Sequence, residues 1–333
     1  MRMSPSVFPR RTAAALIALT GLAVTVAPGL ARAQAWPTKP VTIVVPFPVG
    51  GGTDAFARPL VVPLGKLLGQ QVIVDNRGGA GGNLGAGVAS KAAPDGYTWF
   101  MGGVHHTIAP SIYPRLDYNL GNDFVPVAMI SSVPQVIVVN PKTIPATDLK
   151  GLIAYLKANP GKVTYGSAGN GSSHHLAGEL FKAQTQTFIT HIPYRGTGPA
   201  LQDLMGGQVD MMFDGLGSSA PHIRSGRLRA IAVASDKPAP GFPDVPTTKQ
   251  AGLPGYQVAT WYGLWAVRGT PAPAIERMST ELQNALHSKE VTAIWNNIGA
   301  EPPTLAGKGF ADFVNAETKR WAVVVKDGKI KLD

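Results

Sequence analysis

The sequence predicts an α/β fold made of two lobes, and three observations support this prediction. Short β-branched and aromatic runs alternate with helical patterns along most of the chain, which is typical of parallel sheets covered by helices. A strand, a glycine-rich turn and a helix start follow one another twice, at residues 41–54 and 163–173. Long extended stretches lie near residues 133 and 258, where the chain can cross between lobes. We therefore expect one lobe from residues 34–132 and 259–333 and a second from residues 133–258, each a mostly parallel sheet flanked by helices.

The first lobe is expected to alternate strands and helices joined by short connections. Its strands are predicted at residues 41–45, 72–74, 97–101 and 124–132. A further strand-like run at 136–139, beyond Pro134, falls in the second lobe. Thr53-Asp54 can cap a first helix that runs toward Gly69, and a second helix through residues 88–93 ends at the turn Pro94-Asp95-Gly96.

The second lobe repeats the alternation. Its clearest helix carries leucine or isoleucine at 149, 152, 153 and 156, with Thr147 or Asp148 as cap and Asn159-Pro160-Gly161 as stop. Strands are predicted at residues 163–165, 188–192, 211–213 and 228–234, and further helices after Ser173, at 201–205 and from a cap at Ser218 to Gly226. After a proline-rich crossing, residues 236–255, we expect a strand at 257–267 and helices at 270–286 and 313–324.

The first 33 residues predict a secretory signal peptide. Arg2, Arg10 and Arg11 precede an apolar stretch, and Ala31-Arg32-Ala33 is a small-x-small cleavage site before Gln34. Four of the 30 basic residues lie in this leader, which leaves 26 basic against 20 acidic residues. The remaining chain has no run of five like charges, so a nucleic-acid partner is not expected. A mild positive charge favours acidic small ligands.

The amino-acid composition excludes several kinds of functional site. The 333 residues are 44% hydrophobic and include 39 glycines and 29 prolines, as in a loop-rich globular protein of about two domains. There is no cysteine, which excludes disulfides, thiolate metal sites and cysteine nucleophiles. The fold must therefore be held by core burial alone.

Two loops are candidate ligand sites because each joins a strand to a helix N-terminus, where backbone N–H groups bind anions. The first contains Gly50-Gly51-Gly52-Thr53-Asp54. This loop also fits a degenerate dinucleotide pattern with Asp75 downstream, so a dinucleotide-binding enzyme is an alternative. Pro46, Pro48, the charge of Asp54 and export of the chain oppose that alternative.

The second loop runs from Gly166 to Ser173. Ser167 misses the G-x-S-x-G nucleophile pattern by one position, which leaves a hydrolase as an alternative to a carboxylate ligand held by the serines and the amides around Gly169–Gly171. Asp214, after a predicted strand, is either a contact for a ligand hydroxyl or ammonium or a turn residue before Gly215.

Two histidine pairs, His105-His106 and His174-His175, have neither metal-ligand spacing nor nearby acidic residues in a metal pattern. We expect no metal, and we expect one histidine of each pair to line a polar cleft, with His105 as the candidate in the first lobe. Trp261-Tyr262 is interpreted as core packing where the lobes join.

Taken in order, these segments resemble the Bug-type substrate-binding proteins of the tripartite tricarboxylate transporter family. The matching segments are PFPVGGGTD (46–54), GQQVIVDNRGGAGGNLG (69–85), KAAPDGYT (91–98), YGSAGNGSSHHLAGELF (165–181), PYRGTGPALQDLMGGQVDMMFD (193–214), LRAIAV (228–233) and PDVPT (243–247).

The resemblance implies a periplasmic, monomeric two-lobe binding protein of the type II, Venus-flytrap class. It implies no catalysis and no cofactor: the protein would capture a small carboxylate and deliver it to membrane transporter subunits, or to a sensor ectodomain. Carried over by position, the ligand-binding residues are Phe47, Gly50, Gly51, Thr53, Asp54, Ser167, Gly169, Asn170, Ser172 and Asp214, to which we add His105. Dicarboxylates, tricarboxylates, amino acids and aromatic acids all remain open as ligands.

Two departures from the family pattern concern the first loop and helix. Pro59 and Pro63 interrupt the helix, so we expect a kink or a shorter helix. Gly52 replaces the proline of the usual G-G-P-T-D, which loosens the turn.

Overall fold

Nine strands form the framework of this computed structural model. They are β1 (Val41–Val45), β2 (Val72–Asn76), β3 (Thr98–Gly103), β4 (Phe124–Val139), β5 (Thr164–Ser167), β6 (Thr190–Pro193), β7 (Met211–Gly215), β8 (Arg229–Val233) and β9 (Ala259–Val267). The structure describes Met1 and residues 36–300, 302–327 and 330–331, and the chain from Trp36 onward is one compact unit. The predicted signal peptide thus lies, apart from Met1, outside the described residues.

The helices connect these strands and cover them. They are α1 (Gly52–Leu68), η1 (Ala80–Gly82), α2 (Asn83–Ser90), α3 (Val104–Ile112), α4 (Leu120–Asp123), α5 (Leu149–Ala158), α6 (Ser173–Thr185), α7 (Thr197–Gly206), α8 (Leu216–Arg224), α9 (Ala272–Leu286), α10 (Lys289–Asn297) and α11 (Gly307–Asp327).

The sheet runs in the order β2-β1-β3-β9-β4-β7-β5-β6, with β8 also paired to β4. The short strands pair in parallel, β1 with β2 and β3, and β5 with β6 and β7. The two long strands, β4 and β9, are antiparallel to each other, and β9 is antiparallel to β3. The sheet is therefore mixed, with parallel strands at both ends and antiparallel strands in the middle.

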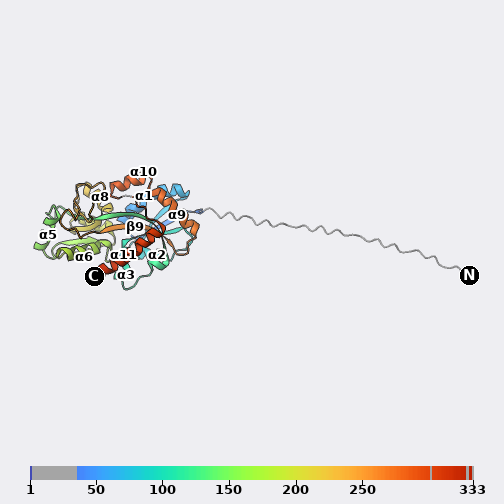
Figure 1. The fold of residues 1–333 in the computed structure, drawn as a ribbon, viewed down its shortest axis with the longest axis horizontal. Coiled ribbons are helices and arrows are strands. Elements are labelled where there is room, and N and C mark those ends of the chain that lie inside the picture. Colours follow the sequence, from blue (N-terminus) through green and yellow to red (C-terminus); the bar gives the residue numbers. More distant parts are fainter. Residues whose placement is uncertain (2–35, 301, 328–329, 332–333) are drawn as a thin grey trace. The chain divides into compact units, whose positions relative to one another are not determined.

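Strand β4 changes partner part-way along its length. Residues 124–134 pair with β9, whereas residues 135–139 pair with β7 and β8. We call β1, β2, β3, β9 and residues 124–134 the first half-sheet, and residues 135–139 with β5 to β8 the second half-sheet. In Figure 1, α5 and α6 lie at the opposite end of the fold from α2 and α9, and β9 runs between them.

Buried apolar side chains hold each half-sheet to its helices. Phe56, Leu60 and Leu64 of α1 pack with β1, β9 and α9 in one cluster. Leu201 and Leu204 of α7 pack with Val136 and Val138 of β4 in another. A third cluster extends from Phe100 through β4 and β9 to Tyr165 and Phe181, and includes Phe310 and Trp321 of α11. Apolar burial is thus continuous between the two half-sheets along one face.

Helix α1 corrects two expectations. It begins at Gly52 with Gly51 as N-cap, so Thr53 and Asp54 lie in its first turn and do not cap it. It also continues through Pro59 and Pro63 to Gly69, whose φ of 72° ends it, so the expected shortening was wrong. Burial of its apolar face offsets the loss of two backbone N–H donors.

Strand β4 corrects a third expectation, because it is one strand of 16 residues and Pro134 does not divide it. Pro134 has no N–H to donate, but the next residue restores the pairing: Gln135 N donates to Val258 O at 2.8 Å. Two register shifts between β4 and β9 lie elsewhere, near Pro126 and near Ser131.

Helix α2 begins five residues and ends three residues earlier than predicted, and two of its eight residues are glycines. A methyl group at Gly85 would lie 2.6 Å from Pro46 Cα and 2.7 Å from Arg77 O, so the helix backbone packs directly on the strand ends. Tertiary packing here overrides the low helix propensity of glycine. Helices α3, α4 and α10 were not predicted, and α8 begins after Gly215 and not at Ser218.

We predict opposite effects for two substitutions in α2. Gly85→Ala should lower the free energy of unfolding by about 1–3 kcal/mol, because the new methyl group overlaps backbone atoms. Gly87→Ala, whose methyl group would lie 3.5 Å from Asp117 Cβ, should be neutral or stabilise by about 0.5–1 kcal/mol. Urea unfolding of both variants measures this, and equal losses would show that the close approach at Gly85 is unimportant.

Candidate functional site

The first loop, between β1 and α1, is organised by the side chain of Asp54. Its Oδ2 accepts hydrogen bonds from Gly50 N at 3.0 Å and from Arg58 Nε at 2.7 Å. Its Oδ1 accepts from Asn76 Nδ2 at 3.1 Å, and the same amide donates to Phe47 O at 2.9 Å. The Asp54 carboxylate therefore fixes the backbone of the loop through hydrogen bonds.

The second loop, between β5 and α6, is held by its serines. Ser172 is the N-cap of α6, and its Oγ accepts from His175 N at 3.3 Å. Ser167 Oγ accepts from Gly169 N at 3.0 Å and lies 2.6 Å from His191 Nε2. Gly169, with φ of 123°, adopts a backbone conformation that side chains disfavour.

A small cavity lies where these loops meet. Its lining combines first-turn residues of four helices with a phenyl ring and two side chains of β9: Phe47, Gly52, Thr53, His105, Ser172, Ser173, His174, Thr197, Thr260 and Tyr262. Gly52 and Thr53 open α1, His105 lies in the first turn of α3, Ser173 and His174 open α6, and Thr197 opens α7. Helices that follow strands of both half-sheets contribute to this lining.

The electrostatic character of this cavity comes from backbone N–H groups. The N-caps of α1, α3 and α7 are Gly51, Gly103 and Gly196, which have no side chain to accept hydrogen bonds from the first turn. The positive ends of these helix dipoles therefore point toward the cavity without a capping carboxylate or hydroxyl. No arginine, lysine, aspartate or glutamate is among the described lining residues. An anion is the ligand that such a lining favours.

Two imidazoles add unpartnered polar atoms to the cavity. His105 Nε2 and His174 Nδ1 are buried and make no hydrogen bond within the described part of the chain. Burial, followed by the neighbouring His106 and His174, holds the pKa of His105 well below its usual value, so His105 is neutral at neutral pH. The Phe47 ring packs edge-on against His105 at 4.7 Å between centroids.

Asp214 lies behind the lining, at the end of β7, with its side chain fully buried. Its Oδ2 accepts from Ser218 Oγ at 2.7 Å and from Ser219 Oγ at 2.5 Å. Its Oδ1 lies 3.3 Å from His174 Nε2. Burial and then the charge of Asp214 raise the pKa of Tyr262, so that hydroxyl keeps its proton.

The cavity is nearly filled by protein atoms, and its free volume is only about 10 Å³. Contacts between the half-sheets surround it: Tyr113 Oη donates to Asn170 O at 2.6 Å. A methyl group at Gly81 would lie 2.7 Å from Asn170 O, and one at Gly196 would lie 2.7 Å from Pro48 Cδ. These glycines allow the loops to touch.

The structure brings the predicted ligand-binding residues into one region, where some line the cavity and others lie in the loops or beneath them. Four of them line the cavity: Phe47, Thr53, His105 and Ser172. Gly50, Gly51, Gly169 and Asn170 form the surrounding loops, and Asp54, Ser167 and Asp214 are buried beneath them. Ser167 is 0% exposed, which argues against attack by its hydroxyl on an ester. Within each histidine pair, only the first member lines the cavity.

The sequence interpretation missed Thr197 and assigned Tyr262 to the core. A signal for Thr197 was present, because Gly196 precedes it and Pro199 follows within the first turn, a typical helix start. No comparable signal marks Tyr262, since β9 is buried along nearly its whole length and alternation is absent.

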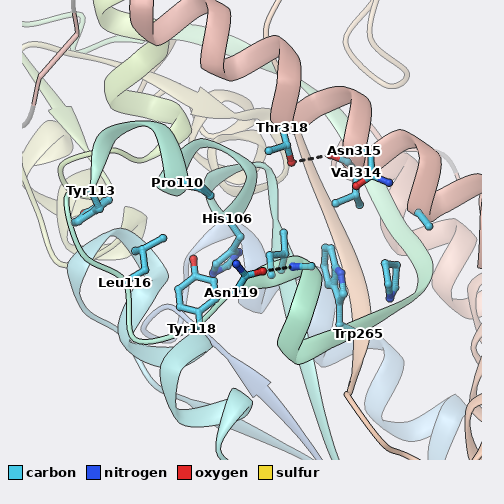
Figure 2. Close-up of a pocket in the computed structure, with 14 residues that line it drawn as sticks. His106, Pro110, Tyr113, Leu116, Tyr118, Asn119, Trp265, Val314, Asn315 and Thr318 are labelled. Carbon is cyan, nitrogen blue, oxygen red and sulfur yellow. Dashed lines mark hydrogen bonds between the residues drawn. The ribbon is translucent and has the colours of Figure 1, made fainter.

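A larger cavity of about 580 Å³ lies on the other side of α3, between α3, the segment around α4 and α11. Figure 2 shows His106, Tyr113, Tyr118 and Asn119 opposite Val314, Asn315 and Thr318 of α11. Several of its buried polar groups already have partners: His106 bonds to Gly103 and Gly82, and Tyr118 Oη donates to Asn83, whereas Trp265 Nε1 has no partner among the described residues. We therefore regard the smaller polar cavity as the candidate site.

The described residues contain neither a membrane-spanning helix nor a cluster of metal-ligating side chains. None of their helices is both long and apolar enough to cross a membrane. Among them, no group of three or more histidine, cysteine, aspartate or glutamate side chains is placed to share a metal ion.

Comparison with known proteins identifies relatives over almost the whole chain. The model of the family described as "Tripartite tricarboxylate transporter family receptor" matches residues 56–330. Three similar solved structures are the periplasmic binding protein BugD, the R. palustris protein Rpa4515 with adipate, and MatC from Rhodopseudomonas palustris with bound malate.

These structures cover between 87% and 89% of this chain and 99% of their own. BugD is 35% identical with a TM-score of 0.85, Rpa4515 is 38% identical with 0.86, and MatC is 37% identical with 0.83. The predicted two-lobe binding-protein fold and the resemblance to Bug-type receptors are confirmed.

His106 provides a prediction about pH, because burial lowers its pKa to about 4 despite a hydrogen bond to Gly82 O that favours the charged form. In the unfolded chain its pKa returns to about 6.5, so the unfolded state binds the proton first as the pH falls. Its contribution to stability is complete above pH 6.5 and is lost as the pH falls toward 4. Between pH 7 and pH 5 this loss should be about 2 kcal/mol.

His106→Gln keeps a polar side chain near Gly103 N and removes this titration. Urea unfolding at pH 7 and pH 5 should therefore show a smaller loss for the variant than for the wild type, by about 2 kcal/mol. Equal losses would mean that His106 is not held neutral by burial.

Proposed function

The chain belongs to the tripartite tricarboxylate transporter receptor family, and from this premise we propose that it is a periplasmic receptor that captures a small carboxylate. One observation carries the proposal: the first turns of α1, α3, α6 and α7 converge on one cavity that has no charged side chain in its described lining. Such a site neutralises a carboxylate with N–H groups and hydroxyls. The relatives with adipate and with malate support this ligand class.

Ligand entry requires the cavity to open. A space of about 10 Å³ holds no more than about one water molecule, far less than an organic acid. We propose residues 34–132 with 259–333 as one lobe and 133–258 as the other. The change of partner on β4 between Pro134 and Gln135 supports this boundary. Hinge rotation there would separate Tyr113 from Asn170 and admit the acid.

The predicted site residues take different roles in this proposal. Phe47, Thr53, His105 and Ser172 would contact the ligand, because they line the cavity. Gly50, Gly51, Gly169 and Asn170 would give the loops their shape, and Asp54, Ser167 and Asp214 would hold the loops in place. Catalysis has no part in this proposal.

Delivery would follow capture. We propose that the leader, residues 1–33, is removed on export and that the mature, monomeric receptor passes its ligand to the membrane subunits of a tripartite transporter. A sensor ectodomain is the alternative recipient. Deletion of the gene separates the two, because a transport receptor is needed for uptake of the acid and a signalling receptor is not.

Titration calorimetry tests whether the protein binds a small carboxylate in this cavity. Dicarboxylates, tricarboxylates, amino acids and aromatic acids are first screened by thermal shift, and at least one should bind. Ser173→Asp then places a negative charge at the start of α6, inside the cavity, and should weaken that binding on the order of 100-fold. Ala272→Asp is the matched control, since it adds the same charge at the exposed start of α9 and should leave the affinity unchanged.

Two results would contradict the proposal. Binding of NAD in place of any acid would favour the dinucleotide alternative. Equal affinities of Ser173→Asp and the wild type would place the binding site outside this cavity.

A further inference from the structure

Asp214 fixes how His174 presents its two ring nitrogens. An ionised carboxylate only accepts hydrogen bonds, and Asp214 already receives Ser218 Oγ and Ser219 Oγ on Oδ2. His174 Nε2 lies 3.3 Å from the remaining oxygen, Oδ1, which is buried and accepts no hydrogen bond from a described residue. The favourable arrangement therefore places a proton on Nε2, facing Asp214. In the neutral imidazole the other nitrogen, Nδ1, is then an acceptor.

That acceptor has no partner. His174 is 7% exposed and lines the cavity, and its Nδ1 is buried without a hydrogen bond to any described residue. A buried polar atom without a partner is costly, so a ligand that supplies the missing donor gains affinity. A carboxylate cannot supply it, because its oxygens have only lone pairs. A hydroxyl or an ammonium group can.

We propose that His174, oriented by Asp214, is the specificity-determining residue of the cavity and selects carboxylates that carry a hydroxyl or amino substituent. The inference rests on the proposed function, because the helix N-termini hold the carboxylate while Nδ1 accepts a hydrogen bond from the substituent. Asp214 acts as a positioning residue, since it contacts His174 and is absent from the cavity lining. An acid that turns a second carboxylate toward Nδ1 would meet lone-pair repulsion.

Matched sets of acids test this selection by titration calorimetry on the mature protein at pH 8. Each set shares one carbon skeleton: succinate, malate and aspartate; adipate, 2-hydroxyadipate and 2-aminoadipate; phenylacetate and mandelate. In at least one set, the substituted acid should bind about tenfold or more tightly than the unsubstituted one.

Three variants connect the preference to His174. His174→Phe keeps a ring without polar atoms and should reduce the preference to less than about twofold. His174→Asn can present its amide oxygen near the position of Nδ1, so it should retain most of the preference. His287→Phe, which changes an exposed histidine of the same chain, is the control and should behave as the wild type.

Nitrogen-15 NMR of the histidine side chains reads the tautomer directly. The chain has seven histidines, and the signals of His174 should show a proton on Nε2 and none on Nδ1. Asp214→Asn should remove this fixed tautomer and weaken the preference.

The outcomes separate the two proposals. Binding of acids without any preference within the sets, or a preference that persists in His174→Phe, would overturn the role of His174 and leave carboxylate capture intact. A proton on Nδ1 would likewise overturn it. Failure of every acid to bind would overturn the proposed function and this inference with it.

Discussion

The first turns of four helices present backbone N–H groups that no side chain caps fully, and the candidate site depends on this single constraint. Three of the N-caps are glycines, and the strands that precede these helices direct their ends toward one point. Buried N–H groups need acceptors, and the positive ends of aligned helices favour a negative charge. A cavity built this way binds an anion without a lysine or an arginine, and so avoids the desolvation of a buried cation.

The long strands β4 and β9 explain how two such sets of helix starts come to face each other. Each half-sheet has its own parallel strands, and β4 belongs to both because it exchanges β9 for β7 and β8 near Pro134. The loops can then meet at glycines such as Gly81 and Gly196, where a side chain would collide. The proposed hinge lies where β4 changes partner, between Pro134 and Gln135.

Much of this fold was predictable because local signals and tertiary packing agree. The β-branched strand at Val41–Val45, the end of the first helix at Gly69 and a cap at Asp148, one of two predicted candidates, all appear in the structure. The errors occur where packing overrides local preference, as at Gly85 in α2 and Pro134 in β4. In the site, Phe47 and Ser172 were carried over from the family resemblance, and both line the candidate cavity. Tyr262 was assigned to the core because a fully buried strand gives no sign of which side chain faces a cavity.

The most direct measurement is a crystal structure of the mature protein with a bound acid, malate or adipate. The acid should lie between the half-sheets, with carboxylate oxygens roughly 3 Å from first-turn N–H groups of α1, α3, α6 or α7. No lysine or arginine should touch it. An acid bound in the larger cavity beside α11, or held by a cationic side chain, would contradict the mechanism.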